Sequence, residues 1–176
     1  DRIRYSEHVL DEGVFIRSLG SRGTLGGLSA SAWLMVRAFD HAGFDIVLLE
    51  TVGVGQTELE IMNVADHVSV VLTPESGDGI QGMKAGLMEI SDLFLVNKSD
   101  RPGADVFARE IEAALELDPR AMSETPPKVM KVSALTGDGV DGFILELDAR
   151  LQKKDGWLSQ RLATKRLQAE AKAMLM

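Results

Sequence analysis

The sequence predicts an α/β domain in which a parallel sheet is flanked by helices. Short runs rich in apolar and β-branched residues alternate along the chain with longer segments of helical period, which is typical of such a sheet. Several of these runs are continuously apolar, as strands covered on both faces should be. Polar and glycine-containing motifs follow the runs. Because the loops after parallel strands line one crevice, we expect the chemistry there.

The sequence predicts five strands and four helices for the domain, followed by one further helix at the C-terminal end. The last segment, Trp157 to Met176, carries apolar residues between Lys and Arg, which indicates an amphipathic helix beyond the sheet. We therefore expect a domain at residues 1–152 and a C-terminal helical arm at residues 153–176 that pairs protomers in a homodimer. The expected strands are Val14 to Arg17, Asp45 to Glu50, His67 to Thr73, Leu93 to Asn97 and Lys128 to Val132, and the helices are about Ser29 to Ala42, Gly82 to Ile90, Ala104 to Leu117 and Gly139 to Leu151.

Composition excludes several classes of function. With 176 residues, 45% of them apolar, the chain can bury one sizeable core. No apolar run approaches the roughly 18 residues of a bilayer span, so we expect a cytoplasmic protein with no membrane partner. A net charge of −8 argues against a nucleic-acid partner. The absence of cysteine and the three scattered histidines argue against thiolate chemistry and a transition-metal site.

The loop after the fourth expected strand matches a guanine-specificity pattern. Asn97 to Asp100 has the sequence N-K-S-D, of the form N-K-x-D. In that pattern the Asp carboxylate accepts hydrogen bonds from guanine N1 and N2, the Asn braces the loop, and the Lys stem packs over the base. Adenine offers neither donor in that geometry. The alternative interpretation is a helix-capping turn, with Asp100 before Pro102.

A second base motif follows the next strand. Ser133, Ala134 and Leu135 begin a loop that contains glycines and can place a backbone amide against guanine O6. This short motif is informative because of its position, one strand and one helix after N-K-x-D.

An acidic residue and a glycine follow the second expected strand. Glu50 can hold a water of Mg²⁺, and the amide of Gly53, three residues later, can meet a γ-phosphate. The alternative is a strand-to-helix turn in which Thr57 caps a helix. Together, the three motifs predict a domain of the P-loop GTPase type, with GTP or GDP and Mg²⁺ as its ligands.

Four segments carry a further signal: Phe15 to Gly27, Glu50 to Gln56, Gly77 to Lys84 and Asn97 to Asp100. These segments resemble the methylmalonyl-CoA mutase-associated GTPases, which are also named ArgK-type proteins. The resemblance implies a homodimeric GTPase of the metallochaperone class that acts as a chaperone for an adenosylcobalamin-dependent mutase. It implies that GTP hydrolysis gates cofactor loading and that the mutase is protected from inactivation. Relatives that deliver metals usually carry Cys and His clusters, so the absence of cysteine favours the cobalamin branch.

The resemblance also implies roles for individual residues. Asp1 and Glu50 would be associated with Mg²⁺, Arg4 with Mg²⁺ and phosphate, and Gly53 with the γ-phosphate. The first two switches would be Gly20 to Gly27 and Gly53 to Glu58. Residues Glu75 to Lys84 would be a third switch, with Asp78, Gln81 and Lys84 as its polar residues; for Gln81 and Lys84 the alternative is a solvated helix start. The base pocket would consist of Asn97, Lys98, Asp100, Ser133 and Ala134.

The phosphate-binding loop G-x-x-x-x-G-K-S/T does not occur in the sequence. The resemblance places that loop and its strand before Asp1, so we expect the sequence to be the C-terminal part of a longer protein. The residue after the switch glycine is Val54, which cannot orient water. Gln56, Gln81 or Lys84 would therefore act in hydrolysis when a partner orders the switches. Two other functions stay open: a transport-system ATPase or kinase, and a dimerisation module deficient in nucleotide binding.

Overall fold

The computed structural model describes residues 5, 8, 10–19, 30–51, 58–75, 85–123 and 125–152 of the 176-residue chain. The chain divides after Val64 into an N-terminal and a C-terminal compact unit. The sheet lies in the C-terminal unit. The arm expected at Trp157 to Met176 lies outside the described residues, so the arm and the boundary at residue 152 stay predictions.

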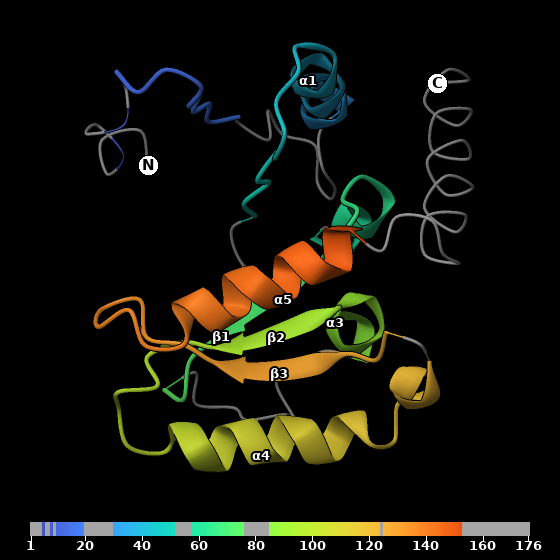
Figure 1. Cartoon of the computed structure of the whole chain (residues 1–176). Helices are drawn as coiled ribbons and strands as arrows, with labels where there is room; N and C mark the ends of the chain where they lie inside the picture. The colour runs from blue at the N-terminus through green and yellow to red at the C-terminus, as the bar shows by residue number, and fades with distance from the viewer. Residues whose placement is uncertain are drawn as a thin grey trace. The chain divides into compact units, whose positions relative to one another are not determined.

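Three parallel strands form the sheet of the C-terminal unit (Figure 1). They are β1 (Ser69–Leu72), β2 (Leu93–Val96) and β3 (Lys128–Lys131), paired in the order β1-β2-β3. The register places Phe94 beside Val70 on one side and Val129 on the other. The three strands predicted in this part of the chain are confirmed, each somewhat shorter than expected. Because the strands run in one direction, the loops after them lie at one edge of the sheet.

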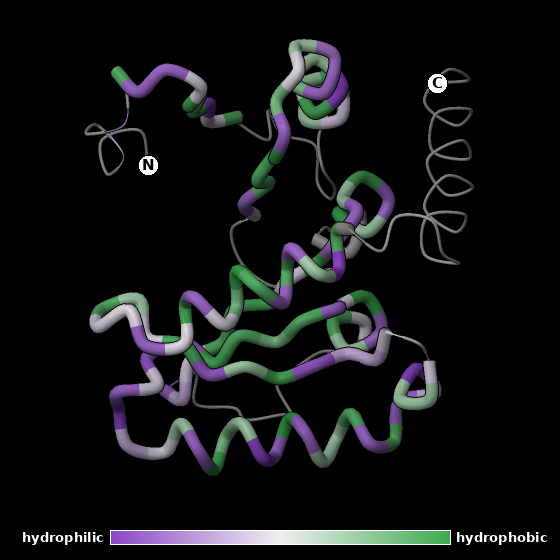
Figure 2. The backbone as a smooth tube through the Cα atoms, in the orientation of Figure 1, coloured by the Kyte–Doolittle hydropathy of each residue, from purple (hydrophilic) through white to green (hydrophobic). Residues whose placement is uncertain are grey.

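Helices cover both faces of this sheet. In Figure 1, α4 (Ala104–Leu115) lies on one face and α5 (Val140–Gln152) on the other, while α3 (Ala85–Ile90) precedes β2 in the chain. All four residues of β2 are buried, which explains why its sequence is continuously apolar (Figure 2). No helix in the described ranges combines the length and apolar character needed to cross a bilayer.

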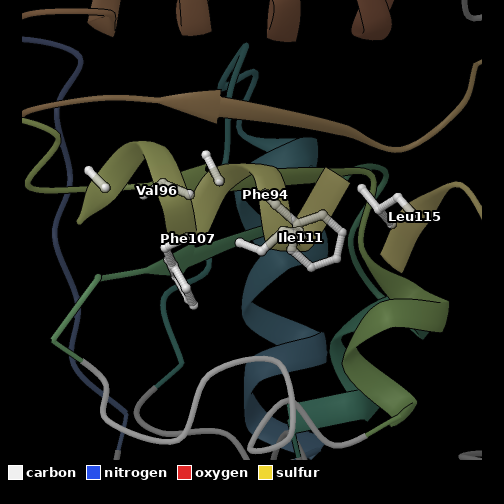
Figure 3. Close-up of a cluster of buried hydrophobic side chains, with 7 residues drawn as sticks. Phe94, Val96, Phe107, Ile111 and Leu115 are labelled. Carbon is white, nitrogen blue, oxygen red and sulfur yellow. The ribbon is translucent and has the colours of Figure 1, made fainter. Parts of the chain in front are cut away.

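The main core lies between β2 and α4 (Figure 3). Phe94 and Val96 of β2 are fully buried and belong to one cluster with Phe107, Ile111 and Leu115 of α4. These three α4 residues recur about once per helical turn, so a single stripe of the helix faces the sheet. The core therefore fixes α4, and with it the loop that joins β2 to α4.

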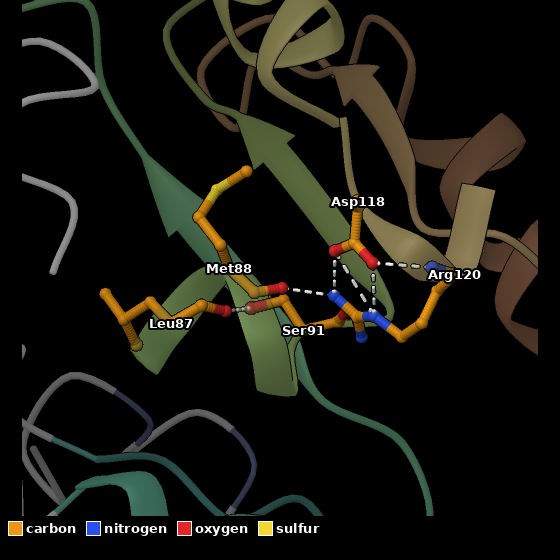
Figure 4. Close-up of polar contacts among 5 residues, drawn as sticks. All are labelled: Leu87, Met88, Ser91, Asp118 and Arg120. Carbon is orange, nitrogen blue, oxygen red and sulfur yellow. Dashed lines mark hydrogen bonds and ion pairs between the residues drawn. The ribbon is translucent and has the colours of Figure 1, made fainter. Parts of the chain in front are cut away.

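A polar anchor joins the end of α3 to the segment after α4 (Figure 4). Arg120, in the short 3-10 helix η3 (Pro119–Met122), donates hydrogen bonds to the backbone oxygens of Met88 and Ser91. Its Nη2 also lies 2.8 Å from Oδ2 of Asp118, whose side chain is 9% exposed. A cation placed here satisfies carbonyls that a helix end leaves without intrahelical partners. The hydrogen bond from the Arg120 side chain lowers the pKa of Asp118.

The N-terminal unit contains helix α1 (Ala30–His41) and the 3-10 helix η2 (Glu58–Asn63). Helix α1 confirms the helix predicted at Ser29 to Ala42. Phe39 of α1 contacts Phe15 and Phe44, with ring centroids 5.4 Å apart in each pair. This aromatic group ties the segments on either side of α1 to the helix.

Two strand predictions in the N-terminal unit are wrong. Val14 to Arg17 and Asp45 to Glu50 lie outside any helix or strand. Ile46 is 62% exposed and Leu48 is 86% exposed. An apolar, β-branched segment has the composition of a strand. It forms a strand only where a neighbouring backbone supplies the partners of its hydrogen bonds. The described residues of this unit supply no such neighbour.

Candidate guanine-binding site

The N-K-S-D segment forms the loop between β2 and α4, and backbone hydrogen bonds anchor it to both neighbouring strands. The Asn97 amide donates to the Leu72 oxygen at the end of β1, at 2.8 Å. The Ser99 amide donates to the Val132 oxygen just beyond β3, at 3.1 Å. The loop is therefore held at the edge where the three strands end, as the parallel topology requires.

Lys98 has a left-handed backbone conformation, with φ of 58°. This conformation is strained for a residue that carries a side chain. Two hydrogen bonds hold the turn: the Lys98 amide donates to Asn97 Oδ1 at 2.8 Å, and the Arg101 amide donates to the Lys98 oxygen at 3.0 Å. The Asn97 side chain thus braces the loop at its most strained residue.

The two base motifs are joined by hydrogen bonds. Ser133 Oγ donates to Asp100 Oδ1 at 2.6 Å, and the Ala134 amide donates to Asn97 Oδ1 at 3.1 Å. Ser133 is fully buried, whereas Asp100 and Ala134 are exposed. The structure therefore brings four predicted site residues into one cluster, in which Asp100 is exposed and the Ala134 amide is hydrogen-bonded to Asn97 Oδ1.

Hydrogen bonds within the loop shape the segment from Ser133 to Gly139. The Ser133 amide donates to the Asp138 oxygen, and Thr136 Oγ1 donates to Asp138 Oδ2, both at 2.8 Å. Gly139 closes the loop with φ of 76°, and a Cβ added there would lie 2.2 Å from the backbone oxygen of Lys131. Glycine is therefore required at this position. Leu135 also lies in the loop, with its side chain 86% exposed.

Asp100 does not cap helix α4. The N-cap residue of that helix is Gly103, with φ of 91°, and the cap has no side-chain hydrogen bond. The Asp100 carboxylate accepts from the Ser133 hydroxyl instead. This geometry contradicts the capping-turn interpretation of the N-K-S-D segment and leaves the carboxylate at the junction of the two motifs.

Three charged side chains border this cluster. Lys98 Nζ lies 2.8 Å from Glu75 Oε2, and Arg101 forms an ion pair with the same carboxylate. Glu75 follows β1, so the ion pairs connect two neighbouring strand ends. Each of the three side chains is between 40% and 51% exposed, so salt will screen their interaction.

The cluster suits guanine better than adenine. The Asp100 carboxylate accepts one hydrogen bond from Ser133 and keeps acceptor capacity for the N1 and N2 hydrogens of guanine. The Ala134 amide is a donor of the kind that guanine O6 accepts. Adenine would place an amino group against this amide and leave the carboxylate without donors. The arrangement can therefore select guanine.

Most of the residues predicted to act at the phosphates lie outside the described part of the chain. Their roles stay predictions. Glu50 is described: it is exposed and lies in the N-terminal unit, outside any helix or strand, and its role toward Mg²⁺ also stays a prediction. The predicted site residues outside the described ranges are Asp1, Arg4, Gly53, Gln56, Asp78, Gln81 and Lys84.

The sequence interpretation assigned no role in the base site to Glu75, Thr136 or Asp138. Glu75 was included only as the first residue of an expected switch, and the other two only as part of a loop. The sequence feature that could have indicated these residues is their position, because each follows a strand at the edge of the sheet that carries the two base motifs.

A surface groove of about 320 Å³ lies between α4 and β3. Its lining includes the ion pair between Lys131 and Asp105, and the hydrogen bond from Lys131 lowers the pKa of Asp105. None of the base-site residues lines this groove. The residues of this groove and those of the candidate base site are therefore different.

A parallel sheet with an N-K-x-D loop hydrogen-bonded to an S-A-L loop indicates the P-loop GTPase class of fold. The family model "Methylmalonyl Co-A mutase-associated GTPase MeaB" matches residues 1–175. The chain belongs to this MeaB family of GTPases, which confirms the resemblance noted in the sequence.

Individual relatives agree with this assignment. A protein of Pyrococcus horikoshii named as a GTPase is 41% identical over 99% of this chain and 56% of its own length. The mouse "Methylmalonic aciduria type A homolog, mitochondrial" is 38% identical over 80% of this chain and 34% of its own length. A crystal structure of an "LAO/AO transport system kinase" aligns with a TM-score of 0.69 and 30% identity, covering 81% of this chain and 47% of that one. The chain thus spans about half the length of the curated relatives it matches.

Proposed function

We propose that the intact protein is a guanine-specific GTPase that acts as a chaperone of an adenosylcobalamin-dependent mutase of the methylmalonyl-CoA mutase type. In this role, GTP hydrolysis gates cofactor loading and protects the mutase. The observation that carries the GTPase part is the hydrogen bond from Ser133 to Asp100, which fixes a base-selecting carboxylate. The mutase part is supported by the family to which the chain belongs.

In the proposed base site, each described residue has one task. Asp100 accepts from guanine N1 and N2, and Ser133 fixes the orientation of that carboxylate. The Ala134 amide turns from Asn97 Oδ1 to guanine O6 when the nucleotide binds. The Lys98 stem packs over the base plane, an apolar contact made by a charged residue.

At the phosphates, the proposal rests on the sequence. Asp1 and Glu50 are the carboxylates that would hold Mg²⁺, with oxygen donors of the kind that this ion prefers. Arg4 and the amide of Gly53 would contact the phosphates. Bound Mg²⁺ would neutralise charge that develops on the β- and γ-phosphate oxygens.

Hydrolysis is proposed to depend on the mutase. Val54 stands where many small GTPases carry a glutamine that orients water, so intrinsic turnover is expected to be slow. Gln56, Gln81 and Lys84 are the groups proposed to reach the γ-phosphate in the complex, with Asp78 in the same switch. The arm at Trp157 to Met176 is proposed to pair two protomers.

Turnover measurements on the intact gene product test this function. GTP hydrolysis should greatly exceed ATP hydrolysis, and the candidate mutase should raise GTP turnover. Lys84→Ala should keep the GTP dissociation constant within about threefold while removing most of the stimulation. Equal use of ATP and GTP would contradict the base site. Phosphate transfer to a small acceptor would favour the kinase alternative, and absence of nucleotide binding would favour the dimerisation module.

A further inference from the structure

One carboxylate binds both cations of the base loop. Glu75 Oε2 lies 2.8 Å from Lys98 Nζ, and Glu75 Oε1 pairs with Arg101. Glu75 lies just beyond β1, whereas Lys98 and Arg101 lie just beyond β2. The contacts therefore span two strand ends that the backbone already joins through the Asn97 amide and the Leu72 oxygen.

These ion pairs are poorly placed to stabilise the fold. The side chains of Glu75 and Lys98 are 47% and 40% exposed, and that of Arg101 is 51% exposed. Exposed pairs of this kind contribute little to the free energy of unfolding, because water and salt screen them. Their effect on the position of the Lys98 side chain is therefore more important than their effect on stability.

Both ends of the Lys98 side chain are held. At the backbone, the left-handed φ of 58° and the hydrogen bond to Asn97 Oδ1 fix the direction in which the side chain leaves the loop. At the far end, Glu75 holds the ammonium group. A free lysine side chain loses much rotamer freedom when it is ordered against a ligand. A stem held at both ends is ordered before the base arrives.

Without Glu75, two effects would displace Lys98. Because the Lys98 ammonium and the Arg101 guanidinium both bind the Glu75 carboxylate, they lie close together. Without its negative charge they would repel each other. The released ammonium would also be attracted by the nucleotide phosphates. Either movement takes the apolar stem away from the base plane.

We propose that Glu75 is a positioning residue of the guanine site, which holds the Lys98 ammonium so that the lysine stem lies against the base. This inference rests on the proposed function, and it adds a residue from the β1 side to the two base motifs. Glu75 acts through Lys98, so its removal should weaken the binding of guanine nucleotides without changing base selectivity, which Asp100 sets.

Dissociation of a fluorescent GDP that carries its label on the ribose tests the proposal in the intact gene product. Glu75→Gln keeps the shape and removes the charge, and it should raise the dissociation rate about tenfold. Glu75→Asp should restore part of the loss. The preference for GDP over xanthosine diphosphate and the melting temperature should not change. Glu110→Gln, at an exposed acid of α4, is the matched control and should leave dissociation within about twofold.

A double-mutant cycle separates positioning from a general charge effect. In a Lys98→Ala background, Glu75→Gln should have no further effect, because the side chain through which Glu75 acts is gone. In an Arg101→Ala background, Glu75→Gln should keep part of its effect, because the phosphates still attract the released ammonium while the repulsion by Arg101 is gone. Additive losses with Lys98→Ala, or dissociation of Glu75→Gln within about twofold of wild type, would overturn the inference alone. A wild-type protein that binds no GDP would overturn the proposed function and this inference with it.

Discussion

The two units of the chain differ in how their apolar runs are paired. In the C-terminal unit, Leu93 and Phe94 of β2 are fully buried between two paired strands and two helices. In the N-terminal unit, the run from Asp45 to Glu50 has a similar composition, yet its Leu48 is 86% exposed. Residue type does not explain the difference. The difference is explained by whether a neighbouring strand completes the backbone hydrogen bonds of the run.

The largest expected effect comes from the core of the paired unit. Phe94→Ala should lower the free energy of unfolding by about 3–5 kcal/mol, because it leaves a cavity against Ile111 and Leu115. Urea unfolding of the intact protein, followed by circular dichroism, measures this change. A loss below about 1 kcal/mol would mean that the contact between β2 and α4 is not a main source of stability. Burial of the paired run would then not distinguish the two units energetically.

The loop after β3 offers a test of backbone shape. Gly139→Ala should cost about 2–4 kcal/mol, because the new Cβ would lie 2.2 Å from the Lys131 oxygen and the residue has φ of 76°. Gly137→Ala is the matched control: it has φ of 84° but nothing within 4 Å of its Cβ, so only strain of about 1–2 kcal/mol applies. Equal melting temperatures for the two variants would contradict the steric argument.

Asp100→Asn should change which base is bound. The substitution replaces one acceptor by a donor, so affinity for GDP should fall about a hundredfold, while xanthosine diphosphate, which offers a carbonyl, should bind more tightly. Isothermal titration calorimetry of the intact protein with each nucleotide measures this change in base preference. Asp105→Asn, at an exposed carboxylate of α4, should leave both affinities unchanged. An unchanged preference in Asp100→Asn would show that the ordered base loops of the C-terminal unit do not select guanine.

The sequence predicted a stretch correctly where the residues of that stretch alone determine its structure or its order. Leu93 to Val96 is continuously apolar because β2 is covered on both faces. The order of the loops follows from N-K-x-D and from S-A-L, which comes one strand later. The strand at Asp45 to Glu50 was predicted wrongly because composition does not specify a pairing partner. Glu75 received no role at the base because its contacts with Lys98 and Arg101 join residues that only the fold brings together.

A smaller effect is expected at the polar anchor of Asp118 and Arg120. The pKa of Asp118 is lowered in the folded protein, chiefly by the Arg120 side chain, so the unfolded chain binds the proton more tightly. The resulting stability is fully present above the unfolded pKa of about 4 and is lost as pH falls through the lower, folded pKa.

Asp118→Asn should therefore cost about 1–2 kcal/mol at pH 7 and less as the pH falls below about 4, so that the two stability curves converge toward acid pH. Urea unfolding of both proteins between pH 7 and pH 3 measures this convergence. A constant difference across that range would mean that the Asp118 charge does not contribute, and that the two curves differ for another reason.

The smallest expected effect tests the comparison of the two units most directly. Leu48→Ala should change the free energy of unfolding by less than about 0.5 kcal/mol, because the side chain is 86% exposed. Leu93→Ala removes the same atoms from a fully buried leucine and should cost about 2–5 kcal/mol. Both variants are measured by urea unfolding of the intact protein. If Leu48→Ala also cost about 2 kcal/mol or more, the run from Asp45 to Glu50 would be buried there. In that case a neighbouring backbone would pair with the run, and the strand predicted from its composition would be correct.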